Sequence, residues 1–183
     1  MQHWIFGYGS LIWRVDFPYH EREQATIDGW SRRFWQGSHD HRGTPDAPGR
    51  VLTLIPDHGA RCVGMAYLVD EDVFEHLDHR EKNGYERVDV DIQLAGRAVP
   101  GVCYIGAEGN FAYLGPAPLG DIAAQIIRSQ GPSGHNIDYL LELDAALATL
   151  GVTEPHVRSL VKLAAECPHR TRQLSPRRRP RGV

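Results

Sequence analysis

Residues 5–13 read IFGYGSLIW, an apolar run with β-strand character that breaks at a Gly-Tyr-Gly-Ser turn. Gly7 and Gly9 flank Tyr8, and glycine both permits positive φ and lets backbone come close to a ligand. Successive N–H groups in such a turn form a nest for carboxylate or phosphate oxygens, and Ser10 adds a hydroxyl donor. The stretch therefore predicts either an ordinary turn after a strand or an anion-binding loop.

A second stretch, LDHREKNGY at residues 77–85, places Glu81 between Arg80 and Lys82 near the end of a predicted helix. Such a glutamate is usually a solvated surface residue that contributes little. The same carboxylate could also accept and return a proton if partial burial raised its pKa. Both interpretations remain open from the local sequence.

Strand patterns dominate the first two thirds of the chain, and helical patterns dominate the rest. Strands are predicted over residues 3–8, 24–34, 51–55 (ended by Pro56), 63–69, 88–94 and 102–105, with a long loop over 39–50. Helices are predicted over residues 71–80, 119–129, 136–150 and 155–166, with Asp70 and Asn136 as the N-caps of the first and third. Strands without regular helical crossovers, followed by helices, predict an α+β fold with an antiparallel or mixed sheet that could close as a small β-barrel.

Length, composition and charge limit the classes of protein to which the chain can belong. A chain of 183 residues with 42% hydrophobic and 23% charged residues is typical of one globular domain. The formal net charge is −3, but residues 170–183 carry six arginines and no acid, so the charge without them would be −9. An acidic body argues against a nucleic-acid-binding core. We therefore expect a domain over residues 1–169 and a basic, disordered tail over 170–183, for which a nonspecific anion tether is the alternative.

The cysteines and the apolar runs indicate a cytoplasmic location. Cys62, Cys103 and Cys167 are an odd, widely spaced set and not a disulfide framework. The first two stand in strand-like runs and are predicted to be small buried hydrophobic residues. No apolar run approaches the roughly 20 residues of a membrane span, and the N-terminus lacks a signal-peptide pattern.

Established cofactor motifs are absent. The Gly-rich turn has no Gly-Lys-Ser/Thr of a P-loop, and Trp13 stands where a GxGxxG fingerprint needs its third glycine. The histidine pairs His39/His41 and His76/His79 raise the question of a metal, but no HExxH or Cys/His spacing accompanies them. We therefore predict no metal and no cofactor.

Eight segments in sequence order resemble the ChaC family of γ-glutamylcyclotransferases that act on glutathione. They are FGYGSLIW at residues 6–13, SRRFWQGS at 31–38, DHRG at 40–43, PGRVLTL at 48–54, LDHREKNGY at 77–85, YIG at 104–106, YLGPAP at 113–118 and GPSGHNIDYL at 131–140. The resemblance covers residues 4 to about 166, and the tail lies outside it. It implies a γ-glutamylcyclotransferase-like mixed β-barrel with flanking helices.

The resemblance also implies an activity and site residues. The family converts a γ-glutamyl peptide into 5-oxoproline, and with glutathione it releases cysteinylglycine. Its catalytic glutamate falls on Glu81, and its substrate loop falls on the segment Ile5, Phe6, Gly7, Tyr8, Gly9, Ser10 and Leu11. Arg50 and Tyr113 stand in matching segments and are weaker candidates for substrate contact, with a structural role as the even alternative.

The reaction needs neither an enzyme nucleophile nor a metal, because the substrate amine attacks its own γ-carbonyl. Well-oriented intramolecular attack reaches effective molarities of roughly 10⁵–10⁸ M. One carboxylate can act as base and then as acid. Two other classes of function remain: a noncatalytic binder of small anions or amino acids that uses the same loop, and an interaction protein that works through its arginine-rich tail.

Overall fold

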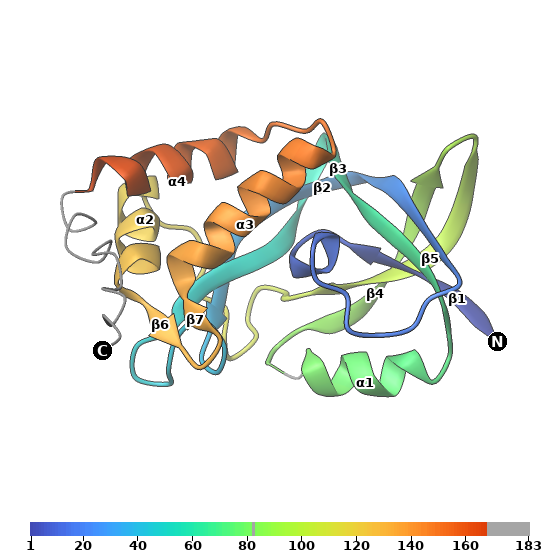
Figure 1. Ribbon diagram of the computed structural model, residues 1–183, viewed down its shortest axis with the longest axis horizontal. Helices are drawn as coiled ribbons and strands as arrows, with labels where there is room; N and C mark the ends of the chain where they lie inside the picture. Colours follow the sequence, from blue (N-terminus) through green and yellow to red (C-terminus); the bar gives the residue numbers. More distant parts are fainter. Residues whose placement is uncertain (82, 168–183) are drawn as a thin grey trace, which may run out of the picture.

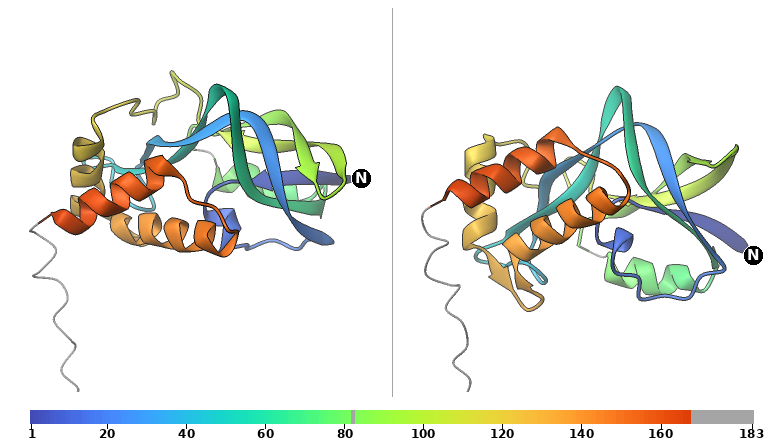
Figure 2. Two further views of the ribbon diagram at one scale, coloured as in Figure 1. Left: turned by 90° about the horizontal axis from the view of Figure 1, so that it is seen from above. Right: turned by 45° about the horizontal axis from the view of Figure 1, so that its top comes forward.

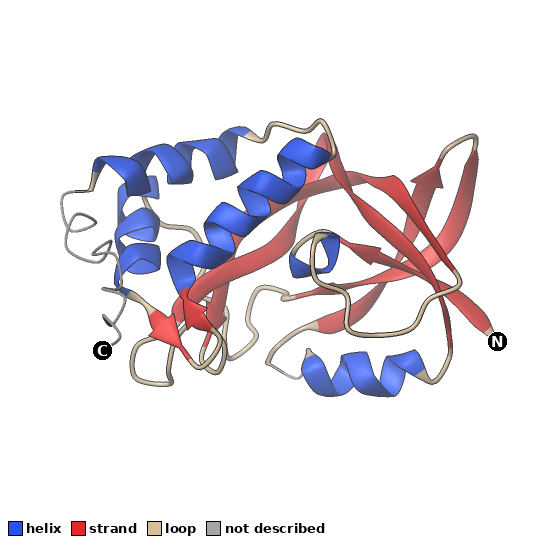
Figure 3. Ribbon diagram, in the orientation of Figure 1, coloured by secondary structure: helices blue, strands red, loops and turns tan. Residues whose placement is uncertain are grey.

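The computed structural model, which describes residues 1–81 and 83–167, is built around a closed five-stranded β-barrel (Figures 1 and 3). Its strands are β1 (Gln2–Gly7), β2 (Glu21–Ser38), β3 (Gly49–Asp70), β4 (Glu86–Leu94) and β5 (Arg97–Ile105), in the order β1-β3-β2-β4-β5. Neighbouring strands are antiparallel except β1 and β5, which pair in parallel at Trp4 and Ile5 and close the barrel. The predicted α+β class with a small mixed barrel is confirmed.

Strands β2 and β3 form a hairpin that is much longer than the barrel itself (Figure 1). The register shifts between Asp28 and Trp30, where residues 57–60 of β3 are extra. One half of the hairpin belongs to the barrel, and the other half runs out beneath the C-terminal helices (Figure 2). The prediction of two strands separated at Pro56 is therefore wrong: Pro56 ends no strand, and β3 continues through it with a bulge.

Four helices flank the strands. Helix α1 (Val73–Arg80) lies against the barrel, whereas α2 (Leu119–Arg128), α3 (Asn136–Thr149) and α4 (Pro155–Glu166) cover the outer half of the β2–β3 hairpin (Figure 1). The apolar faces of α2, α3 and α4 meet through Ile126, Leu143 and Leu160, all fully buried. This burial stabilises helices that are short for independent folding.

Two predicted helix caps are wrong. Asp70 is the last residue of β3, where its carboxylate accepts from His20, and α1 begins three residues later at Val73. Asn136 begins α3 but does not cap it. Its amide accepts from the backbone N–H of Arg50 at 2.7 Å and donates to the Arg50 carbonyl at 2.8 Å. The Asn136 side chain therefore bonds to the buried backbone of β3 and not to the N–H groups in the first turn of α3.

Three short elements were not predicted. A 3₁₀ turn, η1 (Ser10–Ile12), follows β1 directly, and strands β6 (Gln130–Gly131) and β7 (Gly134–His135) make a small hairpin before α3. Each is too short to show a hydrophobic period. The long loop over residues 39–50 is present up to Pro48 as turns between β2 and β3.

The hydrophobic core is continuous from the barrel to the helical layer. Cys62 and Cys103 are 1% and 0% exposed, as predicted, and burial raises the pKa of each thiol to about 12. Neither is therefore a nucleophile at neutral pH. Within the described parts of the chain, every helix is too short or too polar to cross a membrane.

Candidate active site

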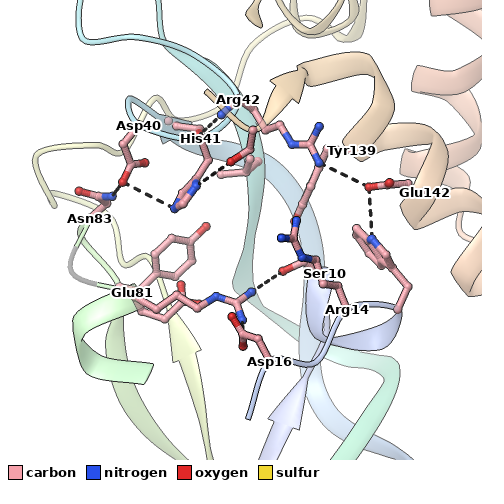
Figure 4. Close-up of a pocket in the computed structure, with 17 residues that line it drawn as sticks. Ser10, Arg14, Asp16, Asp40, His41, Arg42, Glu81, Asn83, Tyr139 and Glu142 are labelled. Carbon is pink, nitrogen blue, oxygen red and sulfur yellow. Dashed lines mark hydrogen bonds and ion pairs between the residues drawn. The ribbon is translucent and has the colours of Figure 1, made fainter. Parts of the chain in front are cut away.

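A cavity of about 460 Å³ lies where the loop after β1, the end of α1 and helix α3 meet (Figure 4). Charged and polar side chains of both signs surround it. The lining residues are Ser10, Trp13, Arg14, Asp16, Gly37, Ser38, Asp40, His41, Arg42, Val51, Arg80, Glu81, Asn83, Tyr85, Ser133, Tyr139 and Glu142. Such a mixed lining suits a zwitterionic ligand and not a purely apolar one.

Glu81 caps the C-terminus of α1, and its side chain is 20% exposed at the cavity wall. Burial raises the pKa of this carboxyl above its ordinary value. Arg80 opposes that shift, whereas the carboxylates of Asp16 and Asp40 add to it. The result is a carboxylate that accepts a proton more readily than a solvated glutamate does.

Arg80 organises the Glu81 wall of the cavity. Its guanidinium donates to Ser10 Oγ at 2.9 Å and to Asp16 Oδ1 at 2.8 Å, and its Nε lies 3.4 Å from Glu81 Oε1 (Figure 4). Asp16 therefore shares the Arg80 guanidinium with Glu81 and makes the shorter of the two contacts. The same guanidinium fixes the Ser10 hydroxyl beside the catalytic candidate.

Arg42 and helix α3 form another wall. Glu142 Oε2 accepts from Trp13 Nε1 at 3.2 Å and lies 3.5 Å from an Arg42 amino group. Arg42 also donates to the His135 carbonyl at 3.0 Å, and its guanidinium lies 6.0 Å from the centre of the Tyr139 ring. These contacts hold Arg42 in one position.

His41 and Asp40 lie on the loop between β2 and β3 and line the cavity (Figure 4). The Nδ1 atom of His41 is 3.1 Å from Ser133 Oγ, and its Nε2 is 3.6 Å from Asp40 Oδ2. Asn83 donates to the same Asp40 oxygen. The three contacts join the loop to the β6–β7 turn and to the segment after Glu81.

The aromatic hydroxyls at the site are neutral donors. Burial raises the pKa of Tyr85 and of Tyr139, and it raises that of Tyr8 as well. Tyr85 donates to the Leu52 carbonyl, and Tyr8 donates to the Tyr104 carbonyl at 2.7 Å. These phenols do not ionise near neutral pH, so they can position groups but are poor bases.

The candidate residues from the sequence divide into two groups. Ser10 and Glu81 line the same cavity, 2.9 Å and 3.4 Å from atoms of the shared Arg80 side chain. Ile5, Phe6, Tyr8 and Leu11 have buried side chains in the core, and with Gly7, Gly9, Arg50 and Tyr113 they are not part of the cavity lining. Across the described residues, the backbone amides from Tyr8 to Leu11 have no hydrogen-bond acceptor, which leaves four donors next to Ser10.

One of the two reasons given for the loop glycines is wrong, because neither Gly7 nor Gly9 has positive φ. Both are needed for space instead. A Cβ on Gly7 would lie 2.6 Å from the Cβ of Leu11, and one on Gly9 would lie 3.0 Å from the Tyr139 hydroxyl. Gly9 therefore lets the loop pack against a residue that lines the cavity.

The Nε and one amino group of Arg50 donate to protein acceptors. Its guanidinium donates to Gln125 Oε1 at 2.7 Å and to the carbonyls of Phe34 and Gly115 at 3.0 and 2.9 Å. Tyr113 is partly exposed and bridges to Gln36 by backbone pairing. These contacts place Arg50 and Tyr113 where they join the outer hairpin to the segment before α2.

Several cavity residues were missed from the sequence: Arg14, Asp16, Arg42, Tyr85, Tyr139 and Glu142. One signal was available for the last two, since their spacing of three places them on one face of α3. Arg42 and Tyr85 lie within the motif segments, and Arg14 and Asp16 come shortly after one, but no local pattern distinguishes these four from surface residues. Among the described residues, no group of three or more His, Cys, Asp or Glu side chains is arranged to hold a metal ion.

Comparison with known proteins assigns the chain to a family. Residues 3–167 match the family model described as "ChaC-like protein". The chain is 47% identical to γ-glutamylcyclotransferase 2-3 of Arabidopsis thaliana over 87% of each chain. It is 39% identical to human glutathione-specific γ-glutamylcyclotransferase 1, over 86% of this chain and 76% of the human one.

A solved structure agrees in fold and sequence. A crystal structure of the yeast γ-glutamyl cyclotransferase specific to glutathione superimposes with a TM-score of 0.84 at 32% identity, covering 90% of this chain and 96% of the yeast one. Barrel, flanking helices and motif order are therefore shared over nearly the whole described length. The chain belongs to the ChaC-like family.

Proposed function

We propose that the protein is a glutathione-specific γ-glutamylcyclotransferase, which cyclises the γ-glutamyl group of glutathione and releases 5-oxoproline and cysteinylglycine. The observation that carries the proposal is a partly buried carboxylate, Glu81, at the wall of a cavity with charges of both signs. Two relatives named glutathione-specific γ-glutamylcyclotransferases, at 39% and 33% identity, support it, and so does the relative at 47% identity that is named γ-glutamylcyclotransferase 2-3.

The proposed reaction is an internal attack. The α-amine forms a bond to the γ-carbonyl carbon, and the amide bond to the cysteine nitrogen breaks. Of the three protons on the α-ammonium nitrogen, one stays in the lactam, and two end on the departing nitrogen, which leaves as an ammonium group. A carboxylate that accepts a proton and returns it serves both halves of this transfer.

In this proposal Glu81 is the proton carrier, and the raised pKa of its carboxyl suits both roles. A solvated glutamate would be a weak base and, once protonated, a very short-lived acid near pH 7. The free amides from Tyr8 to Leu11 and the Ser10 hydroxyl would hold the α-carboxylate or the developing oxyanion. Losing one such donor typically costs about 3–4 kcal/mol of transition-state stabilisation.

Glutathione is the small-molecule partner in this proposal, and no cofactor enters the reaction. We also place the protein in the cytoplasm, because all three cysteines are free and two of them are buried, as in a reducing compartment.

The direct test is the purified protein with glutathione and no added metal. We expect 5-oxoproline and cysteinylglycine in equal amounts, and no loss of rate with EDTA. N-acetylglutathione should not react, because its acylated nitrogen is not nucleophilic. A protein that binds glutathione without turnover would be a noncatalytic binder. Cleavage of the acetylated peptide would require a water or enzyme nucleophile, contrary to the mechanism.

A further inference from the structure

We propose that Arg14 binds the glycine carboxylate of glutathione and thereby makes the cavity select the whole tripeptide. The inference rests on the proposed function and assigns the end of the substrate that does not react. It starts from the charges in the cavity wall, where the described residues supply three arginines and four carboxylates.

Within the described residues, two of the three cavity arginines are already committed to protein acceptors. Arg80 is bound by Ser10, Asp16 and Glu81. Arg42 lies against Glu142 and donates to the His135 carbonyl, and its side chain is only 11% exposed. Neither guanidinium can turn to a ligand without breaking contacts.

Arg14 differs from both. It is exposed and lines the cavity, and among the described residues no hydrogen bond or ion pair involves its guanidinium. It lies two residues after the end of η1, and its own backbone N–H donates to the Ser10 carbonyl at 2.8 Å. The backbone is thus fixed while the guanidinium remains available, and Figure 4 shows the side chain reaching toward the middle of the cavity, next to Ser10.

The length of the substrate fits that placement. Glutathione carries two carboxylates and one ammonium group, so its net charge is −1. A cavity that balances this charge needs one cationic side chain that is not already paired with a protein carboxylate. Its glycine carboxylate lies two residues beyond the reacting carbonyl, roughly 7 Å when the peptide is extended. With the γ-glutamyl group bound next to Glu81, the extended peptide therefore places its glycine carboxylate away from the Glu81 wall of the cavity. A planar guanidinium can bind it through two parallel hydrogen bonds.

The test compares two substrates and four proteins. The substrates are glutathione and γ-glutamylcysteinylglycinamide, which replaces the glycine carboxylate by a neutral amide. The proteins are the full-length wild type, Arg14→Gln, the conservative variant Arg14→Lys and the control Arg61→Gln. Arg61 is an exposed arginine that pairs with Asp28 and lies outside the cavity, so its loss changes net charge equally.

We expect the wild type to prefer glutathione to the amide by roughly 10- to 100-fold in kcat/KM, the range for a hydrogen-bonded charge pair. Arg14→Gln should lose that preference, because its kcat/KM should fall for glutathione and not for the amide. Its kcat for glutathione should stay within threefold of the wild-type value. Arg14→Lys should keep part of it, and Arg61→Gln should keep all of it. The melting temperature should not change, because Arg14 is exposed.

Three results would overturn the assignment. Equal cleavage of both peptides by the wild type would mean that the glycine carboxylate is not recognised. An equal fall for both peptides in Arg14→Gln would place Arg14 at the γ-glutamyl end, and unchanged kinetics would remove it from the site. If the wild type forms no 5-oxoproline from either peptide, the proposed function itself fails and this assignment falls with it.

Discussion

Burial and the charge of Arg80 shift the pKa of Glu81 in opposite directions. Burial raises the pKa of the carboxyl, and Arg80 lowers it through a contact of 3.4 Å that Asp16 weakens by pairing with the same guanidinium. A tighter pair with Arg80 would have kept Glu81 ionised and made it a poor acid. The geometry therefore favours a group that changes its protonation state during a reaction.

The first prediction is that Glu81→Gln removes turnover and spares the fold. Glutamine keeps the size of the side chain but cannot accept the ammonium proton, so kcat should fall by roughly 10²–10⁴. The affinity for glutathione should change little, because the loop after β1 is untouched. Asp28→Asn, at an exposed surface pair, is the control. Activity within threefold of wild type would remove Glu81 from the mechanism, and a large loss of melting temperature would make it structural.

A second prediction concerns pH and uses the same variant. The pKa of Glu81 is raised in the folded state above its ordinary value of 4.5, so between these two values the folded chain binds more protons than the unfolded chain. Stability contributed by this group is therefore present below pH 4.5 and is lost as pH rises through the raised pKa. Relative to Glu81→Gln, the wild-type free energy of unfolding should decline over that window in urea titrations. A difference that is flat or rises with pH would contradict the raised pKa.

Single residues also show what sequence could reveal. Glu81 and Ser10 stand in unusual motifs that made them candidates from the sequence, and both line the cavity. Arg14 follows one of those motifs, but nothing local separates it from a surface arginine; only the cavity and the pairing of its neighbours do. Arg50 also stands in a motif, and its guanidinium donates to two protein carbonyls and to Gln125, which agrees with the structural alternative that the sequence left open.

At the scale of elements, the loop after β1 depends on its contact with α3. The third prediction is that Gly9→Ala lowers kcat/KM for glutathione by about tenfold or more, because its Cβ would lie 3.0 Å from the Tyr139 hydroxyl. Tyr139→Phe removes that oxygen, so the double variant should recover part of the loss. The coupling between the two changes is measured by a double-mutant cycle. Wild-type kinetics in Gly9→Ala would show that the loop has room to move.

Asn136 joins two elements that are 86 residues apart in sequence. The fourth prediction is that Asn136→Ala leaves the N–H and the carbonyl of Arg50 without partners in a fully buried position. Two such groups cost roughly 2–4 kcal/mol, which lowers the melting temperature of a chain of this size by about 5–15 °C. Asp138→Ala, exposed in the first turn of the same helix, should cost less than about 1 kcal/mol. Equal falls in melting temperature in the two variants would mean that Asn136 contributes no more than an exposed residue in the first turn of α3.

The error over Asn136 has a physical cause. Asparagine before a periodic apolar run is a good statistical N-cap because its side chain reaches nearby N–H groups. Here the outer half of β3 supplies a buried N–H and C=O at the same place, and that long-range pair is not visible in the local sequence. The extents of all four helices were predicted closely, because their apolar period depends only on which face is buried.

At the scale of the whole molecule, the long β2–β3 hairpin is the feature that sequence concealed. Bulges and a proline interrupt its period, so it was predicted as separate strands, although each half was located. Because the hairpin runs from the barrel to the helical layer, it brings residues 37–42 and α3 to the same cavity as the ends of β1 and α1. The site therefore exists only in the assembled fold.

The last prediction concerns residues 170–183, which lie outside the described part of the chain. The family match ends at residue 167 and α4 ends at Glu166, so every element that surrounds the cavity precedes the six arginines. We expect a chain of residues 1–169 to keep kcat/KM for glutathione within threefold and its melting temperature within about 2 °C of full length. Arginine side chains far from an active site act on a small substrate only through screened electrostatics, so the two chains should differ less as salt rises. A truncated protein that melts normally but loses activity would overturn the assignment of residues 1–169 as the complete catalytic unit. It would also favour a function exerted through the basic segment.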